Sequence, residues 1–371
     1  MISTISRPRP NQRTALLRSA ILGGCLFAFG GYAHAHTFCV YNTNQLRAAL
    51  AASGDGGAYA SEDDTIYISG GTHHTHGTEF FYSSTDPHTL NIIGMGTQTC
   101  EVTLQKAILT RLDGDGKSRV FETHSTQGAV LFQYLTIQNG RVGPNESGGG
   151  LSMNSHAGDN GQPLVSLVIF RGNHAGFGGG FAIGNGGNFG IDFQNNLVAG
   201  NSADYNDGAG EIVYSGVDGY GTRIVSNTFV GNTVGHQPAN AIGGLYLQTA
   251  TGDTLSNNIF WHNSGYDLDS GGAALLDNDY GSDASTPGPG SSGNLQVNPQ
   301  FVGPANFRLS ATSPLLGIGT LNPPGAYISG IDIRAKPRVV NDKIDLGAYE
   351  RQQSDSGIAP ENDAEDGDDA E

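Results

Sequence analysis

Two kinds of short apolar run alternate with Gly and Asn along the middle of this chain, and both recur about every 30 residues. One kind ends in Asn and reads VIFRGN (168–173), NLVAGN (196–201), NTFVGN (227–232) and NIFWHN (258–263). The other begins with Gly and reads GGGLSM (148–153), GGGFAI (178–183), GAGEIV (208–213) and GGLYL (243–247). The runs are short and rich in β-branched and aromatic residues, so the repeat predicts strands and turns that stack on their own copies.

Stacking explains why each slot of the repeat keeps one kind of residue. One slot is apolar and predicts a continuous core column at strand spacing, formed by Phe170, Val198, Phe229 and Phe260. A second slot is expected to take the left-handed turn conformation and to hydrogen-bond along the stack, and it contains Asn173, Asn201, Asn232 and Asn263. A second ladder is predicted at Asn196, Asn227 and Asn258. The fold class is therefore all-β, a parallel β-helix solenoid.

The first 35 residues have the form of a signal peptide. Four Arg precede an apolar run at 19–33, and Ala33-His34-Ala35 matches the small-x-small pattern of a cleavage site. Lipoprotein cleavage at Cys25 is the alternative, because the residues LGG precede it. The protein is thus predicted to be exported, to the extracellular space or the outer cell surface, with the periplasm as the alternative. No later stretch approaches the roughly 20 apolar residues of a membrane span.

Composition divides the rest of the chain into further segments. Residues 42–53 combine a polar N-cap candidate with helix formers, so they predict one short N-terminal helix that caps the open end of the solenoid. The β-helix is assigned to residues 36–293, ending in TPGPGSSG (286–293), which predicts a linker or exposed loop. A distinct segment covers 294–351. The last residues, 352–371, contain eight acids and predict a disordered acidic tail.

Cysteine count and charge narrow the choice of compartment and partner. Cleavage after Ala35 leaves Cys39 and Cys100, and an even count in an exported chain predicts a disulfide. Cleavage also removes four Arg and no acid, so the formal net charge falls from −17 to −21. This charge argues against nucleic acid and anionic membranes as partners. Nothing in the sequence indicates an oligomeric state.

Two parts of the chain resemble known families. The body, with TIYISGGTH, LNIIGMG, LDGDGKSRVF and YLTIQNG, resembles the right-handed parallel β-helix proteins of the pectin-lyase-like superfamily, especially secreted and surface proteins of bacteria. Residues 298–350, with NPQF, FRL, SP and DLGAYE in order, resemble the choice-of-anchor C-terminal domain. That domain usually carries an Asp shortly after Ser-Pro, where this chain has Gly317. The resemblance implies a right-handed solenoid and sugar polymers as ligands, although a fold alone does not fix a function.

The strongest acidic cluster lies in DYNDGAGE, which contains Asp204, Asp207 and Glu211. Asp192 lies one copy earlier and Arg223 follows on the next copy. A hydrolase needs carboxylates that converge on a groove, and a lyase needs a base beside a bound cation. These five residues are therefore the candidate catalytic groups of an acidic groove.

Glu211 breaks the pattern of its own repeat. Its aligned slot is apolar in the other copies, which have Leu151, Phe181 and Leu245. A carboxylate in the core would have to be paired or bound to a metal. Alternatively, a shift of one residue in register places Ile212 inside and Glu211 in water.

Metal-binding candidates are weaker. The stretch DNDYGSD places oxygen ligands at Asp277, Asp279 and Asp283, which resembles part of a calcium loop without the completing bidentate Glu, and an ordinary solvated loop is the alternative. The neighbouring His73, His74 and His76 could ligate a transition metal, but a surface loop is the alternative, and the separate stretch DGDG (113–116) is expected to be a turn. No cofactor is required by these patterns, and calcium is the one candidate.

The leading function predicted from the sequence is that of a non-catalytic binding or adhesion scaffold for polysaccharide or cell-surface ligands, because neither a base-plus-calcium nor a paired-acid signature is recognisable. The first alternative is a polysaccharide lyase or glycoside hydrolase that acts through the acidic groove. The second is a passive extracellular spacer.

Overall fold

Most of the protein consists of stacked parallel β-strands. The computed structural model describes residues 35–156, 161–215, 221–236, 241–248 and 252–355. Nearly all of the predicted signal peptide and residues 356–371 of the predicted acidic tail lie outside these ranges. Among the described residues, no helix is long and apolar enough to cross a membrane.

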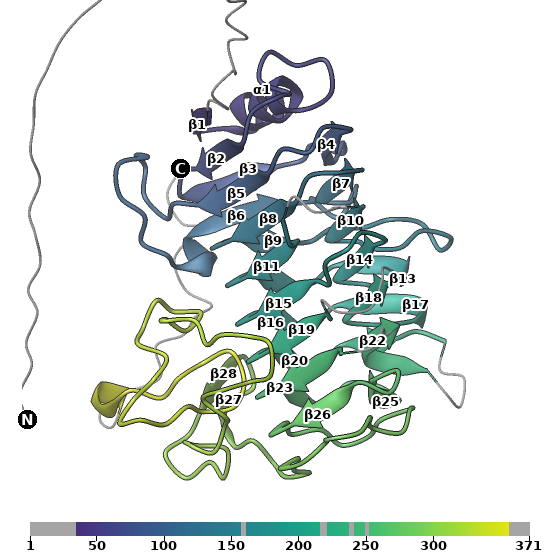
Figure 1. The fold of residues 1–371 in the computed structure, drawn as a ribbon, viewed down its shortest axis with the longest axis vertical. Helices are drawn as coiled ribbons and strands as arrows, with labels where there is room; N and C mark the ends of the chain where they lie inside the picture. The colour runs from purple at the N-terminus through teal and green to yellow at the C-terminus, as the bar shows by residue number, and fades with distance from the viewer. Residues whose placement is uncertain (1–34, 157–160, 216–220, 237–240, 249–251, 356–371) are drawn as a thin grey trace, which may run out of the picture. The chain divides into compact units, whose positions relative to one another are not determined.

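Three long parallel sheets contain most of the strands (Figure 1). Sheet A contains, in spatial order, β1 (Thr37–Val40), β2 (Asp64–Ile68), β5 (Leu90–Gly94), β8 (Val130–Gln133), β11 (Leu164–Ser166), β15 (Asp192–Gln194), β19 (Arg223–Val225), β23 (Thr254–Ser256) and β26 (Ala274–Leu276). Sheet B contains β3 (Gly71–His74), β6 (Thr110–Asp113), β9 (Thr136–Gln138), β12 (Ile169–Arg171), β16 (Leu197–Ala199), β20 (Thr228–Val230) and β24 (Ile259–Trp261). Sheet C contains β4 (Phe80–Ser84), β7 (Phe121–Ser125), β10 (Leu151–Ser155), β14 (Phe181–Asn185), β18 (Gly210–Tyr214), β22 (Ile242–Gln248) and β25 (Tyr266–Asp269).

From β2 onward, successive strands enter sheets A, B and C in that order and then return to A. We call each such pass a rung. In three rungs, an extra strand between sheets B and C forms a small parallel sheet D, which contains β13 (His174–Phe177), β17 (Ser202–Asn206) and β21 (Thr233–Val234). This arrangement is consistent with the β-helix solenoid that the repeat predicts.

The apolar column predicted from the repeat is confirmed. Successive strands of sheet B pair Phe170 with Val198, Val198 with Phe229, and Phe229 with Phe260, and all four side chains are buried. Because a strand points alternate residues to opposite sides, the outer face of each sheet is free to carry other chemistry.

Both Asn ladders are also confirmed. In the first, the Nδ2 of Asn201 donates to the Oδ1 of Asn232 over 3.0 Å and also to a main-chain carbonyl of the previous rung. In the second, Asn227 donates to Asn258 over 2.9 Å, and the series continues to Asn278 and Asn294. The expected left-handed conformation was assigned one residue too late, because in the first ladder it occurs at the residue that precedes each Asn: Gly172, Gly200, Gly231 and His262.

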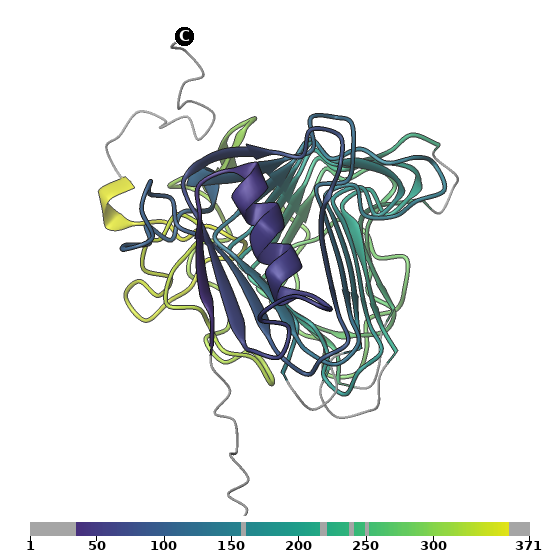
Figure 2. The same ribbon diagram turned by 90° about the horizontal axis from the view of Figure 1, so that it is seen from above.

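A helix covers the N-terminal end of the stack, as predicted. Helix α1 (Thr43–Ser53) begins after Asn42, whose side chain accepts a hydrogen bond from the main-chain N–H of Gln45 over 3.0 Å. It buries Leu46 and Leu50 and packs on β1, β2 and β4, so that it lies across the end of the sheets (Figure 2). Such a cover protects unpaired strand edges from association with other chains.

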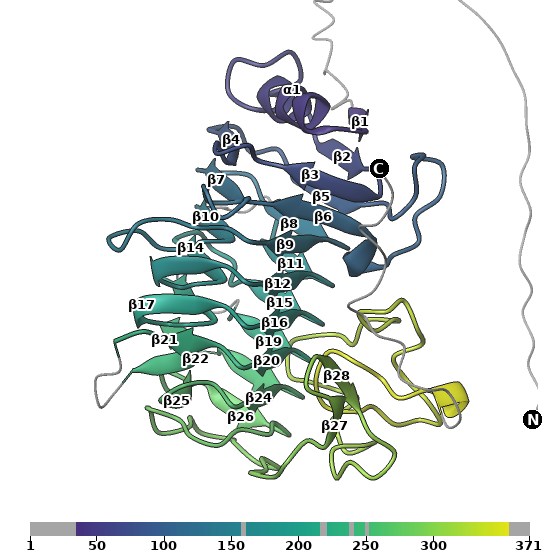
Figure 3. The ribbon, with the colours of Figure 1, turned by 180° about the vertical axis from the view of Figure 1, so that it is seen from behind.

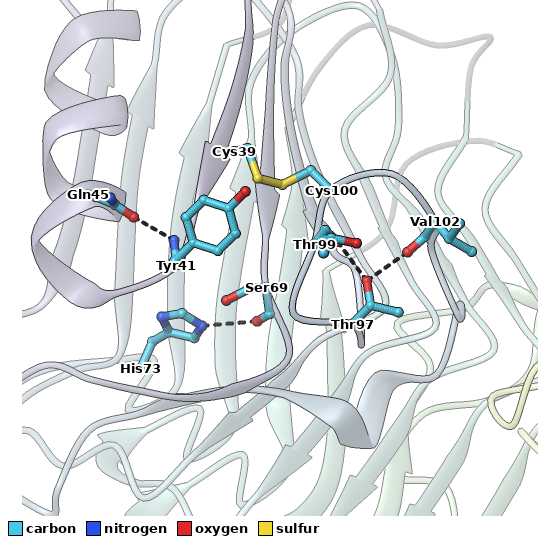
Figure 4. The surroundings of a disulfide bond; sticks show 9 residues. All are labelled: Cys39, Tyr41, Gln45, Ser69, His73, Thr97, Thr99, Cys100 and Val102. Atoms are coloured by element: carbon cyan, nitrogen blue, oxygen red, sulfur yellow. Dashed lines mark hydrogen bonds between the residues drawn. A yellow bond between two sulfur atoms is a disulfide. The ribbon is translucent and has the colours of Figure 1, made fainter.

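The predicted disulfide joins Cys39 to Cys100, with 5.9 Å between their Cα atoms (Figure 4). It connects β1 at the start of sheet A to the loop that follows β5. The two cysteines are 61 residues apart in sequence, and in the chain-entropy model closing a loop of this length stabilises the folded state by about 4 kcal/mol. The bond is consistent with an oxidising compartment.

The stack continues beyond the expected linker at 286–293. The main-chain N–H of Ser292 donates to Leu275 over 2.9 Å, and Leu295 forms an isolated parallel bridge with Asp279. The remainder, residues 296–355, is mostly irregular and lies beside the stack (Figure 3). Its regular elements are η2 (Gln353–Asp355) and the antiparallel pair β27 (Phe301–Gly303) and β28 (Asn306–Leu309).

The DLGAYE motif lies in the interior of this C-terminal segment. Arg338 is fully buried and donates to the carbonyl of Asp345 over 3.0 Å. Asp332 and Glu350 are also buried, and Glu350 accepts from the main-chain N–H of Asp345 over 2.9 Å. Burial raises the pKa of Glu350 to about 8. The motif therefore organises a buried polar core rather than an exposed site.

Candidate functional site

The outer face of sheet C contains the most unusual acidic residues. Asp207 connects β17 to β18 and has a left-handed backbone, with φ of 62°. In the two preceding rungs, the same slot contains Gly148 and Gly178, with φ of 71° and 56°. Glycine adopts this conformation without a Cβ penalty, so an Asp in its place is a strained exception of the kind that clusters at functional sites.

The carboxyl group of Asp207 is buried and incompletely bonded. Only 4% of the residue is exposed, and Oδ1 has no hydrogen-bond partner among the described residues. Burial raises its pKa to about 8, and the charges of Glu211 and Asp269 contribute to the rise. Asp207 is therefore a neutral acid at neutral pH, close to two other carboxyl groups.

Glu211 points outward from β18, and the alternative with a shifted register is confirmed. The strands pair Glu211 with Ala182, whereas Gly210 takes the core slot opposite Phe181 and Ile212 is buried. A Cβ on Gly210 would lie 2.5 Å from the Phe181 ring, so this ring fills the space that a side chain at 210 would need. Glu211 is half-buried on the outer face. Burial raises its pKa, and a hydrogen bond with the side chain of Ser147 opposes the rise.

Glu211 belongs to a column that follows the stack at one residue per rung. The register partners in order are Phe81, Glu122, Ser152, Ala182, Glu211, Tyr246 and Asp269. Burial raises the pKa of Tyr246, as do the nearby charges of Asp269, Asp207 and Glu211. Acids therefore lie on both sides of a stretch of small side chains, about three rungs or roughly 14 Å apart.

Sheet D contributes an exposed aromatic row beside this column. Phe177, Tyr205 and His236 belong to successive rungs, and 5.4 Å separates the ring centroids at each step. Phe177 and Tyr205 are 38% and 41% exposed. Phe177 immediately precedes Gly178, where an added Cβ would lie 3.4 Å from the Cγ of Glu211, so the row and the acids adjoin. Figure 1 shows β13 and β17 beside β14 and β18 of sheet C, and Figure 3 shows β17 and β21 beside β14 and β22.

The five candidate catalytic residues do not share one groove. Asp192 and Arg223 are register partners on sheet A, where Arg223 Nη1 lies 3.6 Å from Asp192 Oδ1. Asp204 lies on sheet D, 3.5 Å from His174 Nε2. Asp192 and Arg223 therefore lie on another sheet, whereas Asp207, in the turn before β18, and Glu211 on β18 lie close together beside sheet C.

The three calcium candidates are not brought together. Asp283 accepts hydrogen bonds from both the main chain and the hydroxyl of Ser270. Asp279 is buried, accepts from the N–H of Val297 over 2.9 Å, and has a pKa raised to about 6 by burial. Asp277 has a left-handed backbone after β26. Asp279 and Asp283 thus bond to different neighbours, and the three residues do not form a converging group of metal ligands among those that the structure describes.

One set of three candidate metal ligands does converge among the described residues: His74, Asp113 and Asp115. The pairing of β3 with β6 places His74 opposite Asp113, a proximity that the separate sequence stretches do not reveal. Asp115 accepts from His74 over 2.6 Å, and Asp113 accepts from the side chains of Gln138 and Asn139. Protein donors therefore account for this cluster without an ion.

Sequence reasoning missed Tyr246, Asp269 and the row formed by Phe177, Tyr205 and His236. Each belongs to the site only through its position in the stack, and the shifted register, with Gly210 in the core slot, is the one that aligns Tyr246 with Glu211. No protein-family model matches the chain, and neither a curated protein nor a solved structure is similar to it by the comparisons made.

Proposed function

We propose that the protein is exported, that its three parallel sheets form a right-handed β-helix, and that the outer face of sheet C with sheet D binds polysaccharide outside the cell. The disulfide and the stacked parallel sheets support the first two parts. The family resemblances of the β-helix and of the C-terminal segment support the same reading. A polymer ligand suits a surface whose chemistry repeats at one residue per rung.

The aromatic row is the observation that carries the binding proposal. Exposed rings cost solubility, and large exposed apolar groups that form a contiguous group usually mark a binding surface. Phe177, Tyr205 and His236 present their rings along the stack axis at a fixed spacing. A sugar chain has apolar ring faces and hydroxyl edges. The aromatic rings can stack on the apolar faces of the sugar rings. The polar column with Glu122 and Glu211 offers acceptors for hydrogen bonds from the sugar hydroxyls.

Replacing Tyr205 by Ala is expected to weaken polysaccharide binding by about tenfold or more, because a stacked aromatic contact contributes about 1–2 kcal/mol at a binding surface. The measurement is affinity electrophoresis of the full chain in gels that contain a panel of neutral and uronate polysaccharides. The matched control is Tyr327→Ala, since Tyr327 is 63% exposed but lies in the C-terminal segment. Equal retardation of both variants and of the parent would contradict the proposal and favour a passive spacer.

Cleavage of the bound chain is a second candidate function, and the acid pair favours it. Glycosidases need one protonated and one ionised carboxyl group, and lyases need a base whose pKa suits the pH. Glu211 points outward, where a bound chain can contact it, and burial raises its pKa. Asp207 is too deeply buried for such contact and would position and tune Glu211.

If the protein cleaves polysaccharide, Glu211→Gln is expected to lower the rate by at least about 100-fold, because loss of a general acid or base typically costs that much. The amide keeps the shape of the side chain, so binding in the same gels should persist. Reducing-end release and unsaturated-product absorbance distinguish a hydrolase from a lyase. The control is Glu101→Gln, at an exposed residue of the loop after β5, outside sheets C and D. A parent protein without turnover on any glycan that it binds would leave binding as the function.

A further inference from the structure

The C-terminal segment covers part of the outer face of sheet B. The main-chain N–H of Ala348 donates to the hydroxyl of Thr228 on β20 over 2.9 Å, and the N–H of Gly347 donates to the carbonyl of Asn257 over 2.8 Å. Apolar side chains of both parts form a shared cluster that includes Ile169, Leu197, Val230, Ile333, Ala348 and Tyr349. The covered face is apolar at these rungs, which explains why the segment docks there.

A cavity of about 420 Å³ remains at the edge of this contact. Its floor consists of Ile169, Leu197 and Ala199 on β12 and β16, and Ile333 and Tyr349 of the C-terminal segment form the opposite wall. The volume is within the range of pockets that hold small organic molecules. The apolar walls would favour a ligand with a ring or hydrocarbon body.

The same cavity is strongly cationic, although the whole chain has a formal net charge of −17. Four basic residues line it, and its one acidic lining residue is Asp355. Arg334 is already paired with Asp332 over 3.1 Å and lies 3.6 Å from Asp355. The other three, Lys106, Arg171 and Lys336, form no ion pair with any described residue. The cavity therefore has a local excess of positive charge.

The fold does not need a positive charge at the position of Arg171, because the same slot contains Ala199 on the next rung. The Nε of Arg171 donates to Gln138 over 2.8 Å, whereas its Nη atoms have no protein hydrogen-bond partner among the described residues. Burial and the nearby Arg111 lower the pKa of Arg171, and the charges of Asp113 and Tyr349 oppose this only in part, so the Arg171 charge is held in unfavourable surroundings. A bound anion would relieve this, because a guanidinium group is well suited to carboxylate and sulfate geometry.

We propose that this cavity is a second binding site, independent of the polysaccharide surface, for a small amphipathic organic anion whose apolar ring body contacts Ile169, Leu197 and Tyr349 while its carboxylate or sulfate bonds to Arg171. Lys106 and Lys336 are both exposed at the cavity and add long-range attraction. The site exists only because the C-terminal segment docks on sheet B, so a ligand there also stabilises that contact.

The test compares two fluorescent probes with the same aromatic body, anilinonaphthalene sulfonate as the anion and phenylnaphthylamine as the neutral form, titrated into the full chain. The anion is expected to bind at one site with a Kd at least about tenfold lower than the neutral probe. Arg171→Gln should raise the Kd of the anion by about tenfold and that of the neutral probe by less than about twofold. Lys336→Gln, at an exposed residue, should raise the Kd of the anion by about threefold. Ala199→Phe, which fills the cavity, should abolish binding of both.

The matched control is Lys117→Gln, because Lys117 does not line this cavity, and it should leave both affinities unchanged. Melting temperatures confirm that the variants are folded. Equal affinity for both probes, or equal effects of the substitutions at 336 and 117, would overturn the proposal. Raising the salt concentration from about 20 mM to about 200 mM should weaken binding of the anion. Stronger binding at high salt would also overturn it, because the acidic residues 356–371 would then be the competing occupant.

Discussion

Replacing Asp207 by Asn is expected to stabilise the protein at neutral pH by up to roughly 4 kcal/mol. Burial and neighbouring charges raise the pKa of Asp207 from 3.8 to about 8 in the folded state. The folded state therefore binds a proton more tightly than the unfolded state does. The stability that this proton provides is fully present below about pH 4 and is lost at about 1.4 kcal/mol per unit as the pH rises towards about 8.

Asparagine removes this titration and also tolerates the left-handed backbone. The difference in unfolding free energy between Asp207→Asn and the parent should thus be near zero at about pH 4 and grow with pH. Urea denaturation at a series of pH values measures it, and taking the difference removes much of the contribution of other raised groups such as Glu350. Asp204→Asn is the control, since Asp204 is partly exposed beside His174 and its loss should change stability by less than about 0.5 kcal/mol.

A less stable Asp207→Asn protein at neutral pH would contradict this account. It would mean that Asp207 is ionised and held by a favourable partner. The expected result, a more stable variant, is instead the pattern of a residue kept for function at a cost in stability.

Replacing Asn232 by Ala is expected to destabilise the folded state by about 3–5 kcal/mol. The Asn232 side chain is fully buried and takes part in several hydrogen bonds. It donates to Val198 O over 3.0 Å and Asn263 Oδ1 over 2.9 Å, and it accepts from both the N–H and the Nδ2 of Asn201. Alanine removes these partners and leaves the polar groups of two neighbouring rungs unsatisfied in the interior.

Guanidinium denaturation of the two proteins measures this effect. Asn154→Ala is the matched control, because Asn154 lies on the outer face of sheet C and is exposed, so its loss should cost less than about 0.5 kcal/mol. If Asn232→Ala unfolded at the same concentration as the control variant, the ladder would be a by-product of turn formation rather than a source of stability.

The candidate catalytic residues differ in how far the local sequence could reveal which of them lie together. Glu211 was visible because it interrupts a repeat, and broken repeats are where functional residues are expected. Asp207 was visible only as a member of the acidic cluster DYNDGAGE. The sequence could not show that Asp192 and Arg223 lie on another sheet than Glu211. Each lies within about one rung of Glu211 along the chain, and this separation does not tell which sheet a strand joins. The position of Glu211 also depended on Gly210, and a Gly-rich run offers several equivalent alignments.

Five features were predictable from the sequence alone: the stacking, the core column, both Asn ladders, the capping helix and the disulfide. The stacking, the column and the ladders follow from periodicity, because an identical residue in every copy must meet its own copy in the next rung. The helix follows from an N-cap candidate before helix formers, and the disulfide from an even Cys count. Three features became visible only in the folded chain: the burial and raised pKa of Asp207, the row formed by Phe177, Tyr205 and His236, and the cavity that Arg171 faces under the C-terminal segment. Exposure, pKa and charge balance depend on which strands and segments meet in space, and residues as distant as Arg171 and Tyr349 meet only after the chain has folded.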